Sequence, residues 1–307
     1  MTKEKTGVQE WAKHSFNFQK GCTNGCKYCY ARRIMQRFEP NIDFENPVLH
    51  LTKTAAALLQ KTVGGVIMFP TMHDISELNK QYYKHYLYML LNNNNKVLVV
   101  TKGNKEIFEV IDHIVTNCPD KLHNLELRVT IGSMDNNRLK YFEPNAPTMD
   151  SRLYLVKYAY EKGIKTSISC EPMLDCSVIN LIPFAQQYAS EIWFGLANGF
   201  FEEGMPKITD KWVQLIINTA KKTDFIKLKD SLTGKRRKQK MNRNVYIIIY
   251  KGGDGLEQAG NECYDAPCQA QEKIIQLEKQ YGKSMKFQLC KISVWQAAKG
   301  EIAKVGE

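Results

Sequence analysis

The sequence predicts an α/β fold, a partial (β/α)6 barrel of the TIM type followed by a C-terminal α+β extension. Three observations lead to this fold class. Between Phe16 and Leu196, short β-rich runs alternate with longer helical patterns about six times. The chain has 307 residues, of which 43% are hydrophobic, and this is enough for one large core. After Leu196 the alternation becomes irregular, which indicates an extension.

Each predicted unit pairs one strand with one helix. The helix at 150–162 illustrates the pattern, because Asp150 can cap its start, apolar residues recur at three-to-four spacing, and Gly163 closes its end. A strand follows at once, as repeated βα units require. The carboxyl ends of parallel strands meet at one rim, so chemistry is expected in the loops after the strands. We expect strands at 15–19, 65–69, 96–101, 125–131, 165–169 and 191–196, and helices at 31–38, 52–61, 80–91, 105–116, 150–162 and 179–188.

The C-terminal third has a different pattern. It predicts a helix at 210–222, a strand at 245–250, a Gly-rich loop at 252–260, a helix near 269–281 and a last strand at 286–291. We therefore divide the chain into a barrel domain at 1–200 and an extension at 201–307.

A basic segment lies at 227–243 of the extension. It has eight Lys or Arg residues and one acidic residue, Asp230, in a chain whose net charge is +11 and whose pI is near 9.1. Such a segment can neutralise phosphates, so nucleic acid is one expected partner. A solvated flexible loop is the alternative. The cations are Lys227, Lys229, Lys235, Arg236, Arg237, Lys238, Lys240 and Arg243.

Hydropathy and cysteine usage suggest a location. No apolar run approaches the ~18 residues of a membrane span, and the first residues are polar and charged rather than a secretory signal. We therefore expect a cytoplasmic protein without a membrane partner. Thiols stay reduced in the cytosol, so the nine cysteines are expected to act as metal ligands or reactive groups, or to be buried, rather than to form disulfides.

Three of these cysteines lie in one short run, Gly21-Cys22-Thr23-Asn24-Gly25-Cys26-Lys27-Tyr28-Cys29-Tyr30. The small residues between them allow a tight loop in which three thiolates converge on one centre. Sulfur ligands select iron–sulfur clusters or zinc. A zinc site needs a fourth ligand, for which His14 is the nearby imidazole, whereas a cluster that binds a cofactor keeps one iron open. Three unrelated thiols are the remaining alternative.

This run resembles the radical S-adenosylmethionine (radical SAM) superfamily, and within it the spore photoproduct lyase-like group related to DNA-repair photolyases. Further blocks at Thr101-Lys102, Ser133-Met134-Asp135 and Phe142-Glu143-Pro144-Asn145-Ala146-Pro147 are similar to that group. The resemblance covers roughly residues 14 to 200. It implies an enzyme whose 4Fe–4S cluster cleaves S-adenosylmethionine reductively to a 5′-deoxyadenosyl radical, which then abstracts hydrogen from a substrate.

The resemblance also implies roles for single residues. Cys22, Cys26 and Cys29 would ligate the cluster, and Tyr28 would lie along the adenine. Thr71 ends the second expected strand, where the superfamily contacts the amino group of the cofactor, although the usual Gly-Gly-Glu ending is absent. The ribose and carboxylate would be surrounded by Lys102, Ser133 and Arg152. A solvated charge is the alternative for Arg152, a strand cap for Lys102 and a turn residue for Ser133.

Other rim residues carry further hypotheses. Cys170, at the end of the fifth expected strand, could give or take a hydrogen atom, or be a small buried hydrophobe. Glu171 could accept a ribose hydroxyl or be an ordinary loop carboxylate. His73 and Asp74 could form an acid–base pair or a satisfied surface pair. The stretch 68–74 lacks the hydrogen-donating cysteine of true spore photoproduct lyases, so repair of that photoproduct is not expected.

The sequence leaves three functions open. They are a radical enzyme acting on nucleic acid, a radical enzyme acting on a peptide or small metabolite, and a non-catalytic zinc or iron–sulfur adaptor for nucleic acid. A radical enzyme also needs a reductase or another one-electron donor as a partner. Cys263, Cys268 and Cys290 could hold an auxiliary metal site, with another cysteine such as Cys176, a carboxylate or substrate as the fourth ligand, or could be scattered thiols.

Overall fold

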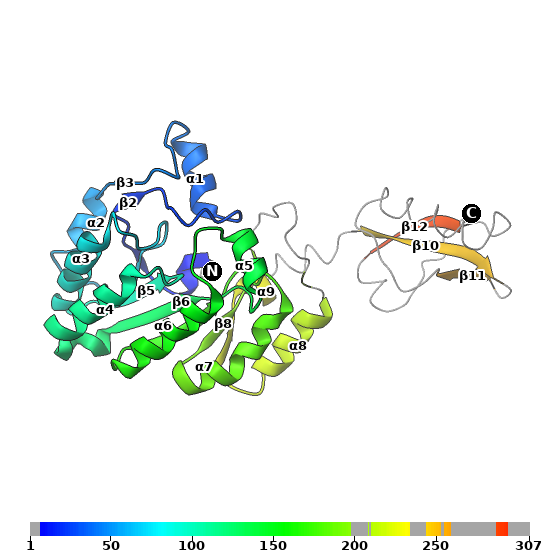
Figure 1. Ribbon diagram of the computed structural model, residues 1–307. Coiled ribbons are helices and arrows are strands. Elements are labelled where there is room, and N and C mark those ends of the chain that lie inside the picture. Colours follow the sequence, from blue (N-terminus) through cyan, green and yellow to red (C-terminus); the bar gives the residue numbers. More distant parts are fainter. Residues whose placement is uncertain are drawn as a thin grey trace. The chain divides into compact units, whose positions relative to one another are not determined.

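The computed structural model describes residues 7–197, 208, 210–233, 244–252, 255–258 and 287–293 (Figure 1). The chain divides into two compact units, Met1–Thr233 and Gly234–Glu307. The first unit therefore continues past the expected boundary at residue 200 and includes α8 (Asp210–Ala220), β9 (Ile226–Leu228) and α9 (Asp230–Thr233).

The first unit is built on a seven-stranded sheet in the order β1-β4-β5-β6-β7-β8-β9, with every neighbouring pair parallel. The α/β class and the parallel sheet are confirmed. In the described residues the sheet is open, because its two outermost strands do not pair with each other. The strands are β1 (His14–Ser15), β4 (Val66–Phe69), β5 (Lys96–Thr101), β6 (Leu125–Thr130), β7 (Lys165–Cys170), β8 (Ile192–Phe194) and β9 (Ile226–Leu228).

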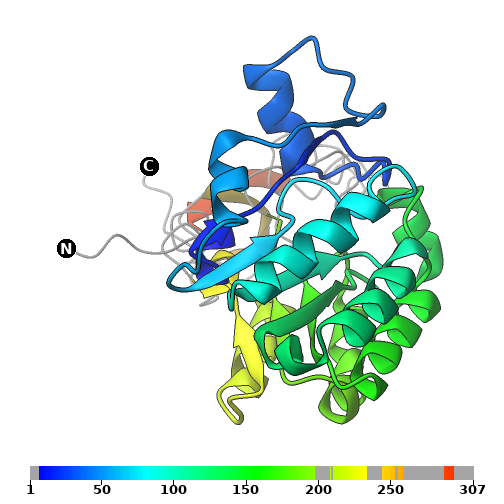
Figure 2. The ribbon, with the colours of Figure 1, turned by 90° about the vertical axis from the view of Figure 1, so that its left-hand side faces the viewer.

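Helices alternate with the strands, and most of them cover one face of the sheet (Figure 1). The helices are α1 (Tyr30–Phe38), α2 (Lys53–Leu58), α3 (Lys80–Asn92), α4 (Glu106–Asn117), α5 (Asn136–Phe142), α6 (Met149–Glu161), α7 (Ile182–Tyr188), α8 (Asp210–Ala220) and α9 (Asp230–Thr233), with 3-10 helices η1 (Gly7–Glu10), η2 (Pro119–Asn124) and η3 (Cys176–Leu181). Figure 2 shows α1 standing out above the sheet. None of the helices in the described ranges has the length and apolar character needed to cross a membrane.

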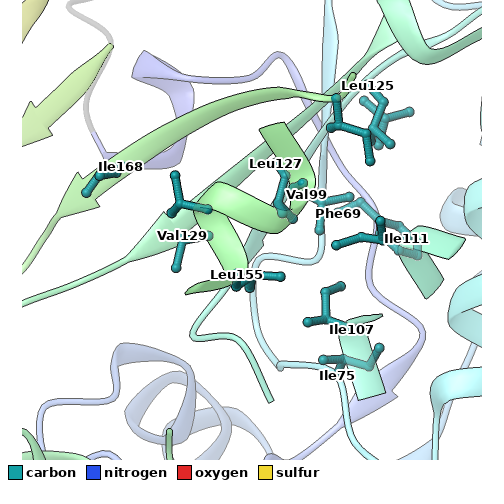
Figure 3. Close-up of a cluster of buried hydrophobic side chains, with 14 of the residues drawn as sticks. Phe69, Ile75, Val99, Ile107, Ile111, Leu125, Leu127, Val129, Leu155 and Ile168 are labelled. Atoms are coloured by element: carbon teal, nitrogen blue, oxygen red, sulfur yellow. The ribbon is translucent and has the colours of Figure 1, made fainter. Parts of the chain in front are cut away.

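The main hydrophobic core lies between the sheet and these helices (Figure 3). Alternate residues of β6, namely Leu125, Leu127 and Val129, point into it, and Ile111 and Leu155 reach it from α4 and α6. Full burial of an aliphatic side chain contributes about 1.5–3 kcal/mol. The alternation of residues along the strands therefore fixes which face of the sheet carries the helices.

The opposite face of the sheet is polar at its centre. Arg128 of β6 is buried; its Nη2 lies 2.7 Å from Glu126 Oε1 and 2.5 Å from Glu191 Oε1, and its Nε donates to Ser167 Oγ at 2.8 Å. Its guanidinium also lies 4.8 Å from the ring centre of Trp11. Parallel sheets usually bury apolar residues on both faces, so a charged inner face distinguishes this sheet.

The N-terminal η1 joins the two ends of the sheet. Lys13 N donates to Val66 O at 3.0 Å beside β1, and Asp230 N donates to Glu10 Oε2 at 2.9 Å beside β9. Lys229 Nζ lies 3.2 Å from Glu10 Oε1 and is 1% exposed. This lysine belongs to the basic segment predicted from the sequence, but it is a buried structural cation and is not available to bind phosphate.

The second unit is described only as an antiparallel sheet in the order β11-β10-β12. Its strands are β10 (Asn244–Gly252), β11 (Gly255–Gln258) and β12 (Phe287–Ser293). The expected strands at 245–250 and 286–291 are found as β10 and β12, while β11 occupies part of the expected Gly-rich loop. The expected helix at 269–281 lies outside the described residues.

Most of the expected units of the barrel are found, with four differences, the first of which is that α5 was not expected. The expected strand at 15–19 is split, so that β1 joins the main sheet and β2 (Gln19–Lys20) pairs instead with β3 (Val48–Leu49). The expected helix at 179–188 is formed by η3 and α7. The seventh strand, β9, lies within the expected extension.

Candidate functional site

The three-cysteine loop connects β2 to α1. Two glycines shape the loop. Gly21 and Gly25 have φ of +88° and +66°, values that residues with a Cβ rarely adopt. A Cβ on Gly21 would lie 2.7 Å from Phe44 O. The loop ends where Cys29 caps α1, its Sγ accepting from Arg32 N at 3.5 Å. The expectation of a tight loop between a strand and a helix is met.

Backbone hydrogen bonds tie this loop to two other segments. Cys22 N donates to Phe44 O at 2.9 Å, and Lys27 N donates to Phe142 O at 2.9 Å. Asn145 Nδ2 donates to Thr23 O at 2.9 Å. Phe142 and Asn145 belong to the end of α5 and the loop after it, which follow the carboxyl end of β6. The cysteines therefore lie at the rim where the parallel strands end, as predicted.

The thiols are partly buried and influence one another. Burial raises the pKa of Cys22 to about 11, helped by the Asp74 carboxylate, while backbone N–H groups of Asn24 and Asp74 donate to its sulfur and lower the pKa. Burial also raises the pKa of Cys26 to about 12; the Lys102 ammonium lowers it, and Glu143, Cys29 and Cys22 raise it. At neutral pH, Cys22 and Cys26 of the metal-free protein are therefore thiols rather than thiolates.

A zinc ion and an iron–sulfur cluster need different arrangements of their ligands. Within the described ranges, no three His, Cys, Asp or Glu side chains are close enough to hold a single metal ion. His14, the expected fourth zinc ligand, starts β1, and its Nε2 lies 3.1 Å from Gly64 O at the opposite end of the strand. Cysteines that bind three different irons of a cubane sit farther apart than those around one ion. A donor set of three thiols is compatible with an iron–sulfur cluster.

A buried ionic cluster lies beside Cys26. Glu143 and Arg152 are both fully buried and form an ion pair, and Tyr28 OH donates to the same carboxylate. Lys102 Nζ lies 3.7 Å from Glu143 Oε1. Burial alone would lower the pKa of Lys102, but Glu143, Tyr28 and Cys26 together outweigh this effect, so the pKa of Lys102 is raised. Lys102 and Arg152 in turn hold the pKa of Glu143 below its usual value despite burial.

The structure thus brings together three residues that the sequence predicted as cofactor-binding, Tyr28, Lys102 and Arg152. Arg152 does not end in open space, because its Nη1 donates to Thr130 O at 2.9 Å and its Nε to Pro147 O at 3.0 Å. Glu143, which joins all three, was absent from the predicted site. It could have been found as the acidic residue in the Phe-Glu-Pro block of the resemblance.

The other predicted contacts lie around this centre. Thr71 follows β4; its Oγ accepts from Asn17 Nδ2 at 2.7 Å, and its carbonyl accepts from Tyr30 OH. Ser133 follows β6; it is buried and donates to the Asp175 carboxylate. Glu171 Oε2 lies 3.6 Å from Lys229 Nζ. Their roles toward a cofactor stay predictions.

Cys170 matches the expected alternative of a small buried hydrophobe, whereas His73 differs from its expected setting. Cys170 is completely buried in the main core, on the helix-facing side of β7, and burial raises its pKa. Its role as a hydrogen donor stays a prediction that this position disfavours. His73 is also buried, which lowers its pKa to about 4, and its Nδ1 faces the backbone carbonyl of Asp74 at 3.4 Å. The expected His73–Asp74 acid–base pair of side chains is therefore not formed.

The expected auxiliary metal site cannot be assigned a geometry. Cys263 and Cys268 lie outside the described residues, and Cys290 lies in β12, where only the backbone is described. Cys176 starts η3 in the first unit and is a free thiol.

The first unit is thus an α/β protein with a three-thiol loop and a buried ionic cluster at the carboxyl rim of a parallel sheet. No family model matches the chain. An uncharacterized protein of Methanocaldococcus jannaschii is 23% identical over 235 residues, which are 70% of this chain and 88% of that protein.

Two solved structures are also similar. One is a cysteine-to-alanine mutant of spore photoproduct lyase, with a TM-score of 0.48 and 14% identity over 71% of this chain and 76% of that chain. The other is SuiB of Streptococcus suis bound to S-adenosylmethionine, with a TM-score of 0.44 and 12% identity over 70% of this chain; the match spans 50% of the SuiB chain. At these values we infer the function from the residues of the site itself.

Proposed function

We propose that this protein is a radical SAM enzyme whose 4Fe–4S cluster is held by Cys22, Cys26 and Cys29. The observation that supports this most is the rim loop itself, in which each of the three thiols lies within electrostatic reach of the others at the carboxyl ends of the parallel strands. When bound, the cluster supplies the electron that cleaves S-adenosylmethionine to a 5′-deoxyadenosyl radical. Reduced thiols of this kind suit the cytoplasm.

The residues around the loop can serve this chemistry in distinct ways. Lys102 lowers the pKa of Cys26 and so favours the thiolate that a metal needs. It is also the cation that we assign to the carboxylate of the cofactor, because its contact with Glu143, at 3.7 Å, is the loosest in the ionic cluster. Arg152 already donates to Glu143, Thr130 and Pro147. We therefore assign Arg152 a supporting role, in place of the direct contact predicted from the sequence.

Anaerobic reconstitution tests this function. After treatment with iron and sulfide, the protein is expected to contain about four irons and four inorganic sulfides per chain at this loop. With dithionite and S-adenosylmethionine it should release 5′-deoxyadenosine, measured by mass spectrometry. A protein that holds one zinc and no sulfide after oxygen-free purification would instead be the zinc adaptor.

Nucleic acid is the substrate class that we propose, with a peptide or small metabolite as the alternative. The support is the charge of residues 235–243, which include Lys235, Arg236, Arg237, Lys238, Lys240 and Arg243 and no acidic residue. Lys229 is excluded from this set by its burial. An external one-electron donor is also required.

Salt dependence tests the choice of substrate class. Binding of a single-stranded oligonucleotide is expected to weaken with salt, and replacing Lys235, Arg236, Arg237 and Lys238 by Gln should lower the slope of log K against log salt by about three. Replacing Lys157, Lys162 and Lys165, which are solvent-accessible cations of α6 and β7, is the control and should leave the slope nearly unchanged. Equal slopes for both variants and the unaltered protein would favour the peptide or metabolite alternative.

A further inference from the structure

Asp74 has an unusual number of hydrogen bonds for a residue outside the cysteine loop. It follows the carboxyl end of β4 and is 8% exposed. Its Oδ1 accepts from Thr101 Oγ at 2.6 Å and Ile75 N at 2.8 Å, and its Oδ2 accepts from Lys102 N at 2.7 Å and Asn24 Nδ2 at 3.1 Å. Each carboxylate oxygen of Asp74 therefore accepts two hydrogen bonds.

These bonds connect the cysteine loop to the ends of β4 and β5. Asn24 lies between Cys22 and Cys26 and is buried, and its Oδ1 accepts from Asn104 Nδ2 at 3.0 Å. The same Nδ2 donates to Ile75 O at 2.6 Å. Asp74 also lies close enough to Cys22 for its carboxylate and its backbone N–H to influence the pKa of that thiol. Asp74 thus contacts the loop through the Asn24 side chain and lies beside the Cys22 sulfur.

We propose that Asp74 is the positioning residue of the cysteine loop, holding Cys22 and Asn24 in place against the ends of β4 and β5. It acts through these two residues and does not itself touch the reacting atoms. With both oxygens fully engaged, its carboxylate has no lone pair to offer as a general base. Groups that hold metal ligands in orientation commonly change metal retention by 10- to 100-fold. The relation to a cluster rests on the proposed function, whereas the ordering of the loop does not.

Asp74→Asn is the variant that tests this proposal most directly. The amide keeps the size of the side chain but replaces one acceptor oxygen by an NH2 group, so Ile75 N or Lys102 N would face another donor. Loss of hydrogen bonds to a buried charged group favours local opening by about tenfold or more. Asp112→Asn is the matched control, because that carboxylate also accepts two bonds, from Tyr158 and Lys162, on an exposed helix face far along the chain.

The first measurement uses the metal-free full chain. Alkylation by iodoacetamide is followed by peptide mapping, with Cys176 as the internal reference thiol. Asp74→Asn should raise the rate at Cys22 relative to Cys176 by about tenfold, and Asp112→Asn should not. Because removal of the Asp74 charge also lowers the pKa of Cys22 and so speeds alkylation, the increase supports the proposal only if Asn24→Ala, which keeps this charge, raises the ratio as well. General destabilisation would raise both rates together. An unchanged ratio of Cys22 to Cys176 would overturn the proposal, whether or not the protein binds a cluster.

A second variant shows whether Asp74 acts through the loop. Asn24→Ala should raise the ratio of the alkylation rates at Cys22 and Cys176 by a similar factor. The double variant should raise this ratio by much less than the product of the two single factors, because both substitutions break the same contact. Independent, multiplicative effects would contradict action through Asn24. In the reconstituted protein, Asp74→Asn should lose iron to a chelator at least about tenfold faster. If the unaltered chain takes up no iron, the proposed function fails while the alkylation result still decides the role of Asp74.

Discussion

Cys26→Ala is expected to abolish formation of 5′-deoxyadenosine. The substitution removes one of three sulfur ligands, and loss of partners one step further from a metal already costs about 10- to 100-fold, so more than a 100-fold decrease is expected. Iron and sulfide content should decrease with it. Cys26 is the best of the three positions for this test, because Cys29 also caps α1 through its sulfur and Cys22 accepts hydrogen bonds from the loop.

Cys176→Ala is the matched control for this prediction. Cys176 is another partly exposed free thiol of the first unit, but it lies at the start of η3 and not in the loop. Its replacement should leave the iron and sulfide content and the yield of 5′-deoxyadenosine unchanged. Product from Cys26→Ala at the level of the control would show that the cluster ligands are assigned wrongly.

Local patterns explain why much of this fold and the centre of the site could be predicted. Strand β5 was expected and found at 96–101, because its apolar run is bounded by turn residues and is followed by a helical pattern. The thiols at Cys22, Cys26 and Cys29 are close in sequence, and glycines at the positive-φ positions of the loop can be recognised directly. Features with short sequence separation leave a readable pattern.

The features that were missed depend on residues far apart in the chain. Glu143 joins Tyr28, at a separation of 115 residues, to Arg152. The fourfold bonding of Asp74 uses residues 24 and 101–102. Lys229 was read as an exposed charge because charged side chains usually are, whereas η1 at the other end of the chain buries it. Propensity and periodicity contain no information about such contacts.

The second large effect is expected for Arg152→Met, which should destabilise the fold. Arg152 is completely buried and donates to Glu143, Thr130 and Pro147. A methionine of similar length would leave the Glu143 carboxylate buried with Lys102 as its remaining cation and two carbonyls without donors. Removing one partner of a buried ion pair lowers the free energy of unfolding by about 3–5 kcal/mol. The measurement is urea unfolding of the metal-free protein, in which the midpoint should fall at unchanged slope.

Lys157→Met provides the control on the same helix. Lys157 is exposed and pairs with Glu161 one turn away, so its loss should change the free energy of unfolding by about 0.5 kcal/mol or less. Arg152→Met combined with Glu143→Leu should recover part of the loss, with a coupling of about 1 kcal/mol or more, because the unpaired carboxylate is then removed. The combination distinguishes a pair that supports the fold from two residues that act separately.

The same variants decide between the two roles of Arg152. If Arg152 is a supporting residue, Arg152→Met should weaken binding of S-adenosylmethionine only to the extent that the loop and Lys102 lose their positions. This variant should also unfold at a clearly lower urea concentration than Lys157→Met. A direct contact with the cofactor would give the reverse pattern, with a raised Kd in calorimetry and an unfolding midpoint equal to that of the control. That second pattern would restore the cofactor contact predicted from the sequence and contradict the supporting role.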